Sequence, residues 1–197
     1  MQKLEDAELR PSPSRDDIMA MPLPLPKYTI RDLYSFQPDG QRYELLEGFL
    51  IVTPGPGAPH QLVAARLMGA LMNYLGSAAY VVGPGTVEQP PLTHLEPDLL
   101  VFPPPLPKRL EWKKLSGHWL AVEIYSRSSR RYDHDYKRDA YLALGVREVW
   151  LIDRRERSVL VSTEAKRDRR ITEVLTWHPP ELGDAFSLPL DQLFVDL

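Results

Sequence analysis

The fold is decided by the apolar run Trp119-Leu120-Ala121-Val122-Glu123-Ile124-Tyr125, the segment 132–144, and a second apolar run, Glu148-Val149-Trp150-Leu151-Ile152-Asp153. Both runs are rich in β-branched and aromatic residues, which predicts buried strands. The segment between them has helical spacing and stops at Gly145, a residue that favours a helix C-terminus. Strand, helix and strand in this order predict a right-handed parallel crossover, and so a mixed α/β fold.

Further elements extend outward from this unit. Hydrophobic spacing predicts helices at 29–36, 60–75 and 190–194, and strands at 42–52 (two strands about a turn at Glu47-Gly48), 79–82 and 98–102, with a last hairpin in 158–177. We therefore expect a mixed β-sheet flanked by helices, with added β-hairpins.

The composition predicts one folded domain. The chain has 197 residues, of which 43% are hydrophobic and 26% charged, as in an ordinary globular protein. Five prolines lie in or beside the polar opening, so we expect residues 1–26 to be a flexible Pro-rich tail and residues 27–197 to be a single domain.

The absence of cysteine excludes disulfides, thiolate zinc sites and a cysteine nucleophile, and it favours a cytoplasmic location. No apolar run approaches the roughly 20 residues that span a bilayer, so no membrane association is expected.

Positive charge is concentrated in one region. Residues 127–170 hold 13 Lys and Arg against 8 Asp and Glu, although the whole chain has a net charge of −3. Seven of these cations flank the predicted last hairpin: Arg154, Arg155, Arg157, Lys166, Arg167, Arg169 and Arg170. Such a cluster would suit a phosphate backbone, and a solvated surface is the alternative interpretation.

Glu123 is the residue that the fold alone does not explain. It lies in the middle of the most apolar strand, and alternation places it on one face with Trp119, Ala121 and Tyr125. A buried carboxylate must be neutralised, hydrogen-bonded, paired or bound to a metal, and such groups are frequent in functional sites. Asp98 raises the same question at the start of its own strand, where an ordinary turn carboxylate is the alternative.

Lys137 supplies a third polar group. On a helical wheel it lies within the apolar stripe formed by Ala140, Tyr141 and Leu144, which a helix packs against the sheet. Its ammonium is therefore expected to point toward Glu123, although an i, i+4 pair with Asp133 would also satisfy it. Two carboxylates and a lysine suit Mg2+ or Mn2+ and the hydrolysis of a phosphodiester.

These residues also carry a resemblance. Pro97-Asp98, followed by Val122-Glu123-Ile124, resembles the PD-(D/E)XK signature of restriction-endonuclease-like nucleases. With Tyr43-Glu44-Leu45-Leu46-Glu47-Gly48, the helix from His60, and residues 132–153, the chain looks more narrowly like the Uma-two family of predicted endonucleases. The resemblance covers about residues 27–197 and implies a restriction-endonuclease-like fold.

The resemblance also implies roles for particular residues. Asp98 and Glu123 match the family's metal ligands, and His60 is a neighbour of the site. Glu44 is a candidate further carboxylate, for which an exposed strand residue is the alternative interpretation. The usual lysine position, two residues after the acid, holds Tyr125. The resemblance implies that Lys137 supplies the missing amine.

Three hypotheses follow. The first is a Mg2+ or Mn2+ dependent endonuclease acting on DNA, with Asp98 and Glu123 holding the metal, Lys137 beside the attacking water and Glu44 assisting. The second is a non-catalytic module that binds nucleic acid or protein, for which Tyr125 is the best argument. The third is a hydrolase of another phosphate ester. A homodimer would suit cleavage of both DNA strands, and no residue decides that point.

Overall fold

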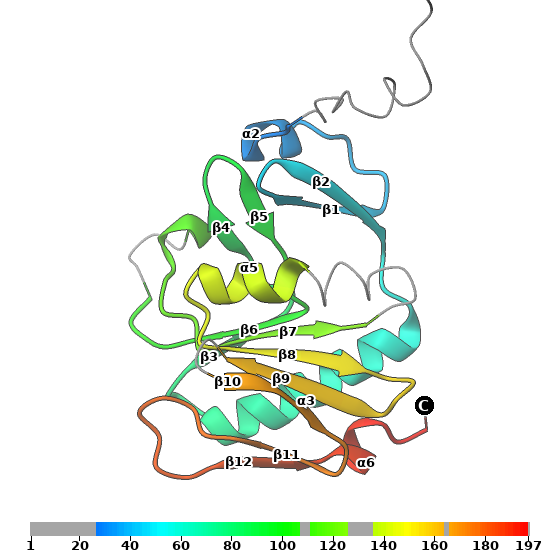
Figure 1. Ribbon diagram of the computed structural model, residues 1–197, viewed down its shortest axis with the longest axis vertical. Helices are drawn as coiled ribbons and strands as arrows, with labels where there is room; N and C mark the ends of the chain where they lie inside the picture. The colour runs from blue at the N-terminus through cyan, green and yellow to red at the C-terminus, as the bar shows by residue number, and fades with distance from the viewer. Residues whose placement is uncertain (1–26, 107–110, 126–135, 164–165, 197) are drawn as a thin grey trace, which may run out of the picture.

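A six-stranded sheet forms the centre of the molecule, in the order β10-β9-β8-β7-β6-β3 (Figure 1). The computed structural model describes residues 27–106, 111–125, 136–163 and 166–196, so the predicted tail at 1–26 lies outside the described residues. The strands of this sheet are β3 (Tyr80–Val82), β6 (Leu99–Phe102), β7 (Leu120–Ile124), β8 (Glu148–Asp153), β9 (Ser158–Thr163) and β10 (Lys166–Ile171).

The strand directions bring three element ends to one edge of this sheet. Strands β7 and β8 are parallel, with Glu123 opposite Leu151, which confirms the predicted crossover. Strand β6 runs antiparallel to β7, with Leu99 opposite Val122. The start of β6 and the C-terminal ends of β7 and β8 therefore lie together, and this edge carries the candidate site.

A second sheet has four strands in the order β2-β1-β5-β4. Its strands are β1 (Gln41–Leu46), β2 (Phe49–Pro54), β4 (Val87–Gln89) and β5 (Thr93–Leu95). Strands β1 and β2 form the predicted hairpin about Glu47 and Gly48. The short helix α2 (Ile30–Leu33) lies beside β1, with Thr29 and Asp32 forming a capping box at its N-terminus.

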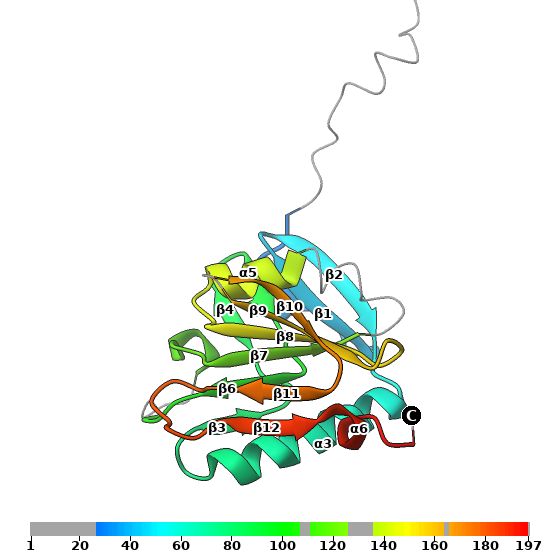
Figure 2. The same ribbon diagram turned by 60° about the horizontal axis from the view of Figure 1, so that its bottom comes forward.

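Two helices cover opposite faces of the six-stranded sheet (Figures 1 and 2). Helix α3 (Ala58–Leu75) packs Val63, Leu67 and Leu71 into a large apolar cluster with alternate residues of β7 and β8. Helix α5 (Arg138–Ala143) packs Tyr141 into a second cluster, which contains Ala121 of β7 and Val149 and Leu151 of β8. The prediction of a sheet between helices is thus confirmed.

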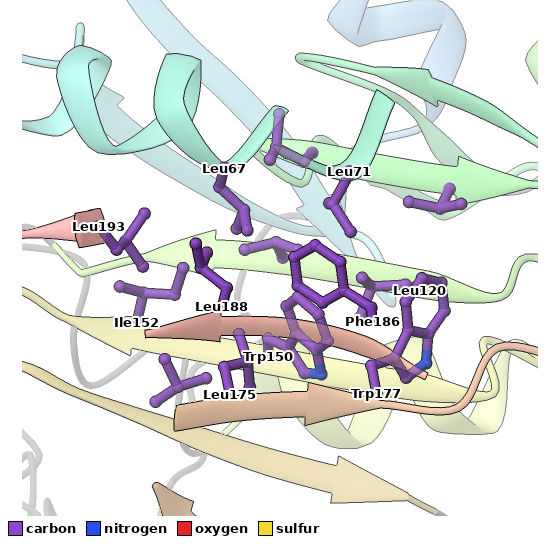
Figure 3. Close-up of a cluster of buried hydrophobic side chains, with 14 of the residues drawn as sticks. Leu67, Leu71, Leu120, Trp150, Ile152, Leu175, Trp177, Phe186, Leu188 and Leu193 are labelled. Carbon is purple, nitrogen blue, oxygen red and sulfur yellow. The ribbon is translucent and has the colours of Figure 1, made fainter. Parts of the chain in front are cut away.

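The larger cluster is closed by the C-terminal part of the chain. A hairpin of β11 (Val174–Trp177) and β12 (Phe186–Pro189), followed by α6 (Leu190–Leu193), covers the same face as α3. Figure 3 shows the rings of Trp150, Trp177 and Phe186 together, and the two tryptophan centroids lie 5.6 Å apart in an edge-to-face arrangement. Aromatic residues of this size bury much of the apolar area that stabilises the domain.

Two sequence predictions need correction, and four short elements were not predicted. Residues 158–177 were predicted as one hairpin, but β9 pairs with β10 whereas β11 pairs with β12, because a second turn after β10 starts a new two-stranded sheet. Strands β4, β5 and β12 and the 3-10 helix η1 (Trp112–Lys114) were not predicted. Trp119 precedes β7 and packs in the cluster on the α3 side, so it does not share a face with Glu123.

Within the described part of the chain, no helix is both long and apolar enough to cross a membrane.

Candidate active site

A small pocket lies at the sheet edge where β6 begins and β7 and β8 end. It encloses about 90 Å³. Its walls are the loop from β2 to α3, the start of α3, and side chains of the neighbouring strands and of the segment before α5. The lining residues are Arg42, Thr53, Pro54, Gly55, Pro56, Gly57, His60, Asp98, Glu123, Ile124, Lys137 and Arg154.

Asp98 is held on both of its carboxylate oxygens. Oδ1 accepts hydrogen bonds from the two terminal nitrogens of Arg42, at 3.2 and 3.3 Å. Oδ2 lies 2.9 Å from Nε2 of His60 and accepts the backbone N–H of Ile124 at 2.8 Å. The last bond joins the start of β6 directly to β7, beside Glu123.

These contacts set the ionisation of Asp98. Burial acts to raise its pKa, but the hydrogen bond and charge of His60, the charge of Arg42 and the amide of Ile124 together hold the pKa below its ordinary value. Asp98 is therefore ionised near neutral pH although it is only 7% exposed.

Glu123 meets two groups from the α5 region. Its Oε1 accepts a hydrogen bond from the hydroxyl of Tyr141 at 2.6 Å and one from Nζ of Lys137 at 3.3 Å. All three side chains are at most 2% exposed. Lys137 lies in a π-helical turn just before α5, a local widening of the helix that is frequent at functional sites.

Glu44 contacts the same lysine from the other sheet. Its Oε2 lies 2.6 Å from Nζ of Lys137, and its Oε1 accepts the backbone N–H of Glu96 at 2.8 Å. Glu44 is completely buried, so the alternative of an exposed strand residue is wrong. The structure therefore brings Glu44, Glu123 and Lys137 together, and Asp98 lines the same pocket. The predicted pair between Lys137 and Asp133 lies outside the described residues.

Arg42 is a site residue that sequence reasoning missed. It lies on β1 two residues before Glu44, and so on the same face of the strand. Burial opposes its charge, but the surrounding carboxylates of Asp98, Glu123, Glu44 and Glu96 hold its pKa above the ordinary value. A charged residue paired by alternation with another suspected site residue is the signal that could have identified it.

A second layer of charges backs Arg42. Its Nε lies 3.7 Å from Glu96, which in turn lies 3.3 Å from Nε2 of His94. His94 Nδ1 lies 2.8 Å from Glu88. Burial acts to lower the pKa of His94, but its two glutamate partners raise it above the ordinary value. The hairpin of β4 and β5 thereby stabilises the position of Arg42.

The donor set suits a hard divalent cation. Among the described residues, no three His, Cys, Asp or Glu side chains lie close enough together to bind one metal ion. Mg2+, however, keeps several waters and takes only one or two protein carboxylates. Asp98 and Glu123 are two carboxylates on one pocket, and the low pKa of Asp98 keeps it in the form that binds a cation.

Comparison with known proteins identifies the family. The family model described as "Uma2: Putative restriction endonuclease" matches residues 27–191. A solved structure described as a putative nuclease belonging to DUF820, from Anabaena variabilis, is 18% identical and superposes with a TM-score of 0.71 over 85% of this chain and 97% of that chain. No curated protein matches the chain. The fold is thus the restriction-endonuclease-like α/β fold that was expected, and the chain belongs to the Uma2 family.

Proposed function

We propose that this protein is an endonuclease that hydrolyses phosphodiester bonds in DNA and depends on Mg2+ or Mn2+. The observation that carries the proposal is the place of Lys137. Its Nζ lies 3.3 Å from the carboxylate of Glu123, although it comes from the start of a helix and not from the strand position occupied by Tyr125. Two carboxylates and an amine thus line one pocket, a set that suits metal-assisted hydrolysis of a phosphodiester.

Asp98 and Glu123 would hold the metal ion. When bound, such an ion polarises the scissile phosphate and lowers the pKa of the attacking water. Arg42 and His60 keep the carboxylate of Asp98 ionised and fix its orientation. The amide of Ile124 fixes its distance from β7.

Lys137 acts on the reacting groups. It carries a positive charge at the wall of the pocket, where it can donate a hydrogen bond to a phosphate oxygen as negative charge develops there. Glu44, 2.6 Å from its Nζ, pairs with the amine and holds its position. Tyr141 holds Glu123 by its hydroxyl, so each acting group has a partner that orients it.

The test is cleavage of supercoiled plasmid DNA with Mg2+ or Mn2+ and with EDTA. The wild type should nick or linearise the plasmid only with metal, and Glu123→Gln should lose at least about a hundredfold in rate, as removal of a catalytic group commonly does. Glu156→Gln is the matched control. This substitution removes the same charge from an exposed turn, so it should leave the cleavage rate unchanged. A Glu123→Gln variant that cleaves as fast as the wild type would contradict the assignment.

A non-catalytic binding module is the second candidate. It is favoured by the way the chain itself balances the carboxylates: Arg42 and His60 pair with Asp98, and Lys137 pairs with both Glu44 and Glu123. Calorimetric titration of Mg2+ and Mn2+ into wild type and Asp98→Asn separates the two. Binding that is lost in the variant supports the nuclease, whereas a folded wild type that takes up neither ion, with and without DNA, favours the binding module.

A further inference from the structure

The structure divides the basic cluster around β9 and β10 into residues with different environments. Arg157 donates to the carbonyl of Phe194 at 2.9 Å and lies over that ring, 5.5 Å from its centroid. Arg170 donates to the hydroxyl of Ser158 at 3.0 Å. These two arginines stabilise the fold. Arg154 differs from both, because it lines the candidate active-site pocket with Asp98, Glu123 and Lys137.

Arg154 has no acceptor among the described residues. Its side chain is partly buried and its Nε is fully shielded from solvent, yet this atom has no hydrogen-bond partner there. Burying part of a guanidinium without an acceptor costs free energy. The other cations of the pocket, Arg42 and Lys137, are both satisfied by carboxylates. Among the described residues, Arg154 is thus the pocket cation whose N–H donors have no acceptor.

The backbone around Arg154 is fixed by its neighbours. Buried Asp153, the last residue of β8, accepts the backbone N–H groups of Arg155 and Glu156 at 3.0 and 3.1 Å. Strand β8 is in register with β7, with Ile152 opposite Ile124. Arg154 therefore follows directly from the sheet edge at which Glu123 lies. The backbone that carries Arg154 is thus held in place before a ligand binds, which favours a precisely placed contact.

Arg154 gives one side of the pocket a charge that suits an anion. The lining contains the cations Arg42, Lys137 and Arg154 and the carboxylates Asp98 and Glu123, and of these cations only Arg154 has no carboxylate partner among the described residues. The 18-residue helix α3 also starts at this pocket, and its N-terminal dipole adds positive potential. Arginine binds phosphate through two parallel N–H bonds, which a single ammonium does not provide.

We propose that Arg154 is a substrate-binding residue that holds a phosphate of the nucleic-acid backbone beside the reacting phosphodiester. This inference rests on the proposed function and adds to it a residue that discriminates a polyanionic strand from a small phosphate ester. The contact is to nonbridging phosphate oxygens, so it orients the strand without reading its sequence.

The test compares Arg154→Ala and Arg154→Lys with Arg155→Ala. The control removes the same charge one residue away, from an exposed side chain that does not line the pocket. Binding of a short fluorescent DNA duplex is measured by anisotropy in EDTA, at two salt concentrations, so that cleavage does not enter. Thermal unfolding of every variant is measured in parallel.

Arg154→Ala should weaken duplex binding by at least about tenfold, and Arg154→Lys should recover part of the loss. Arg155→Ala should stay within about twofold of wild type. The thermal unfolding midpoint of Arg154→Ala should not fall below that of the wild type. The substitution breaks no hydrogen bond or ion pair with a described residue, so it should not destabilise the folded protein. A purely structural role would instead lower that midpoint.

Equal binding by Arg154→Ala and Arg155→Ala overturns the inference, and so does a wild type that does not bind the duplex. The plasmid assay keeps the two proposals apart. A wild type that cleaves DNA while both variants bind equally contradicts only the role of Arg154. A wild type that cleaves nothing, with binding lost in Arg154→Ala alone, supports the phosphate contact and contradicts the nuclease.

Discussion

Lys137 carries its charge inside the protein, between carboxylates that come from two different sheets. Its Nζ lies 2.6 Å from Glu44 and 3.3 Å from Glu123, and the side chain is 2% exposed. An ion so placed is stabilised only by its partners, because water cannot solvate it. The residues for which we propose a catalytic role therefore also hold the site together.

Replacing Lys137 by methionine should lower the free energy of unfolding by about 3–5 kcal/mol, because two buried carboxylates would lose the ammonium that both contact. The variant Lys137→Met with Glu44→Gln should be more stable than the sum of the two single changes predicts, since one stranded charge is removed. Urea unfolding at pH 7 of wild type, both single variants and the double variant measures this coupling. Simple additivity would contradict a shared ion pair.

His118 gives a prediction about pH. It packs edge-on against Phe102, neither ring nitrogen has a hydrogen-bond partner among the described residues, and burial lowers the pKa of His118 to about 4. As the pH falls, the His118 ring takes up a proton near pH 6.5 in the unfolded chain but only near pH 4 in the folded protein. Stability conferred by the neutral ring should therefore be full above pH 6.5 and lost as the pH falls toward 4.

The His118→Phe variant has no such group to titrate. The loss of stability between pH 6.5 and 4 should be smaller in this variant than in wild type, by up to about 3 kcal/mol. Chemical denaturation at a series of pH values measures the difference. Parallel pH curves for the two proteins would show that His118 does not titrate as expected.

At the residue scale, the sequence predicted which ionisable groups need explanation but not all of their partners. Glu123 and Lys137 stood out because each interrupts an apolar pattern, and the structure places them in contact. Their roles in metal binding and catalysis stay predictions. Arg42 did not stand out, because an arginine on a half-exposed strand is normally solvated, and its contact with Asp98 joins residues 56 positions apart.

At the scale of elements, the turn between β1 and β2 is strained at one position. Leu46 pairs with Phe49, so the loop has two residues, Glu47 with φ 52° and Gly48 with φ 84°. Both values are in the left-handed region, which matches the type I′ turn preferred by two-residue hairpins. Glycine suits this conformation, whereas glutamate adopts it at a cost.

Replacing exposed Glu47 by asparagine should therefore raise the free energy of unfolding by about 0.5–1 kcal/mol, because asparagine tolerates positive φ. Gly48→Ala should act in the opposite direction, since a Cβ at this residue would lie 3.3 Å from the carbonyl oxygen of Tyr28 as well as at an unfavourable φ. Urea unfolding of the two variants checks both signs. A destabilised Glu47→Asn variant would contradict the strain.

The elements that the sequence predicted and those that it missed differ in how clearly they show an apolar pattern. The helix α3 and the central strands show clear periodicity over many residues and were found. Strands β4 and β5 have three residues each and flank two consecutive prolines. They are too short to show the alternation of apolar and polar residues that marks a strand. They form because β5 pairs with β1, a contact between Leu45 and His94 that no local pattern shows.

At the scale of the whole molecule, the domain boundary at residue 27 is a prediction that proteolysis can test. The described chain begins at Lys27, and the backbone N–H of Tyr28 donates to Gly48 at 2.8 Å, which fixes the entry into the domain. Brief trypsin digestion of the full chain should yield a product whose N-terminus is Asp16, after cleavage at Arg15. Mass spectrometry identifies it, and an N-terminus that resists trypsin would contradict the predicted tail.

The pocket draws its charged residues from Arg42 on β1 to Arg154 after β8, and the pairing of β7 with β8 is what brings the last of them to the edge. A chain still emerging from the ribosome cannot assemble this pocket until β8 has been synthesised and has joined the sheet. Long-range pairing of this kind forms late and slowly. A nascent chain that stops before β8 therefore lacks the complete pocket.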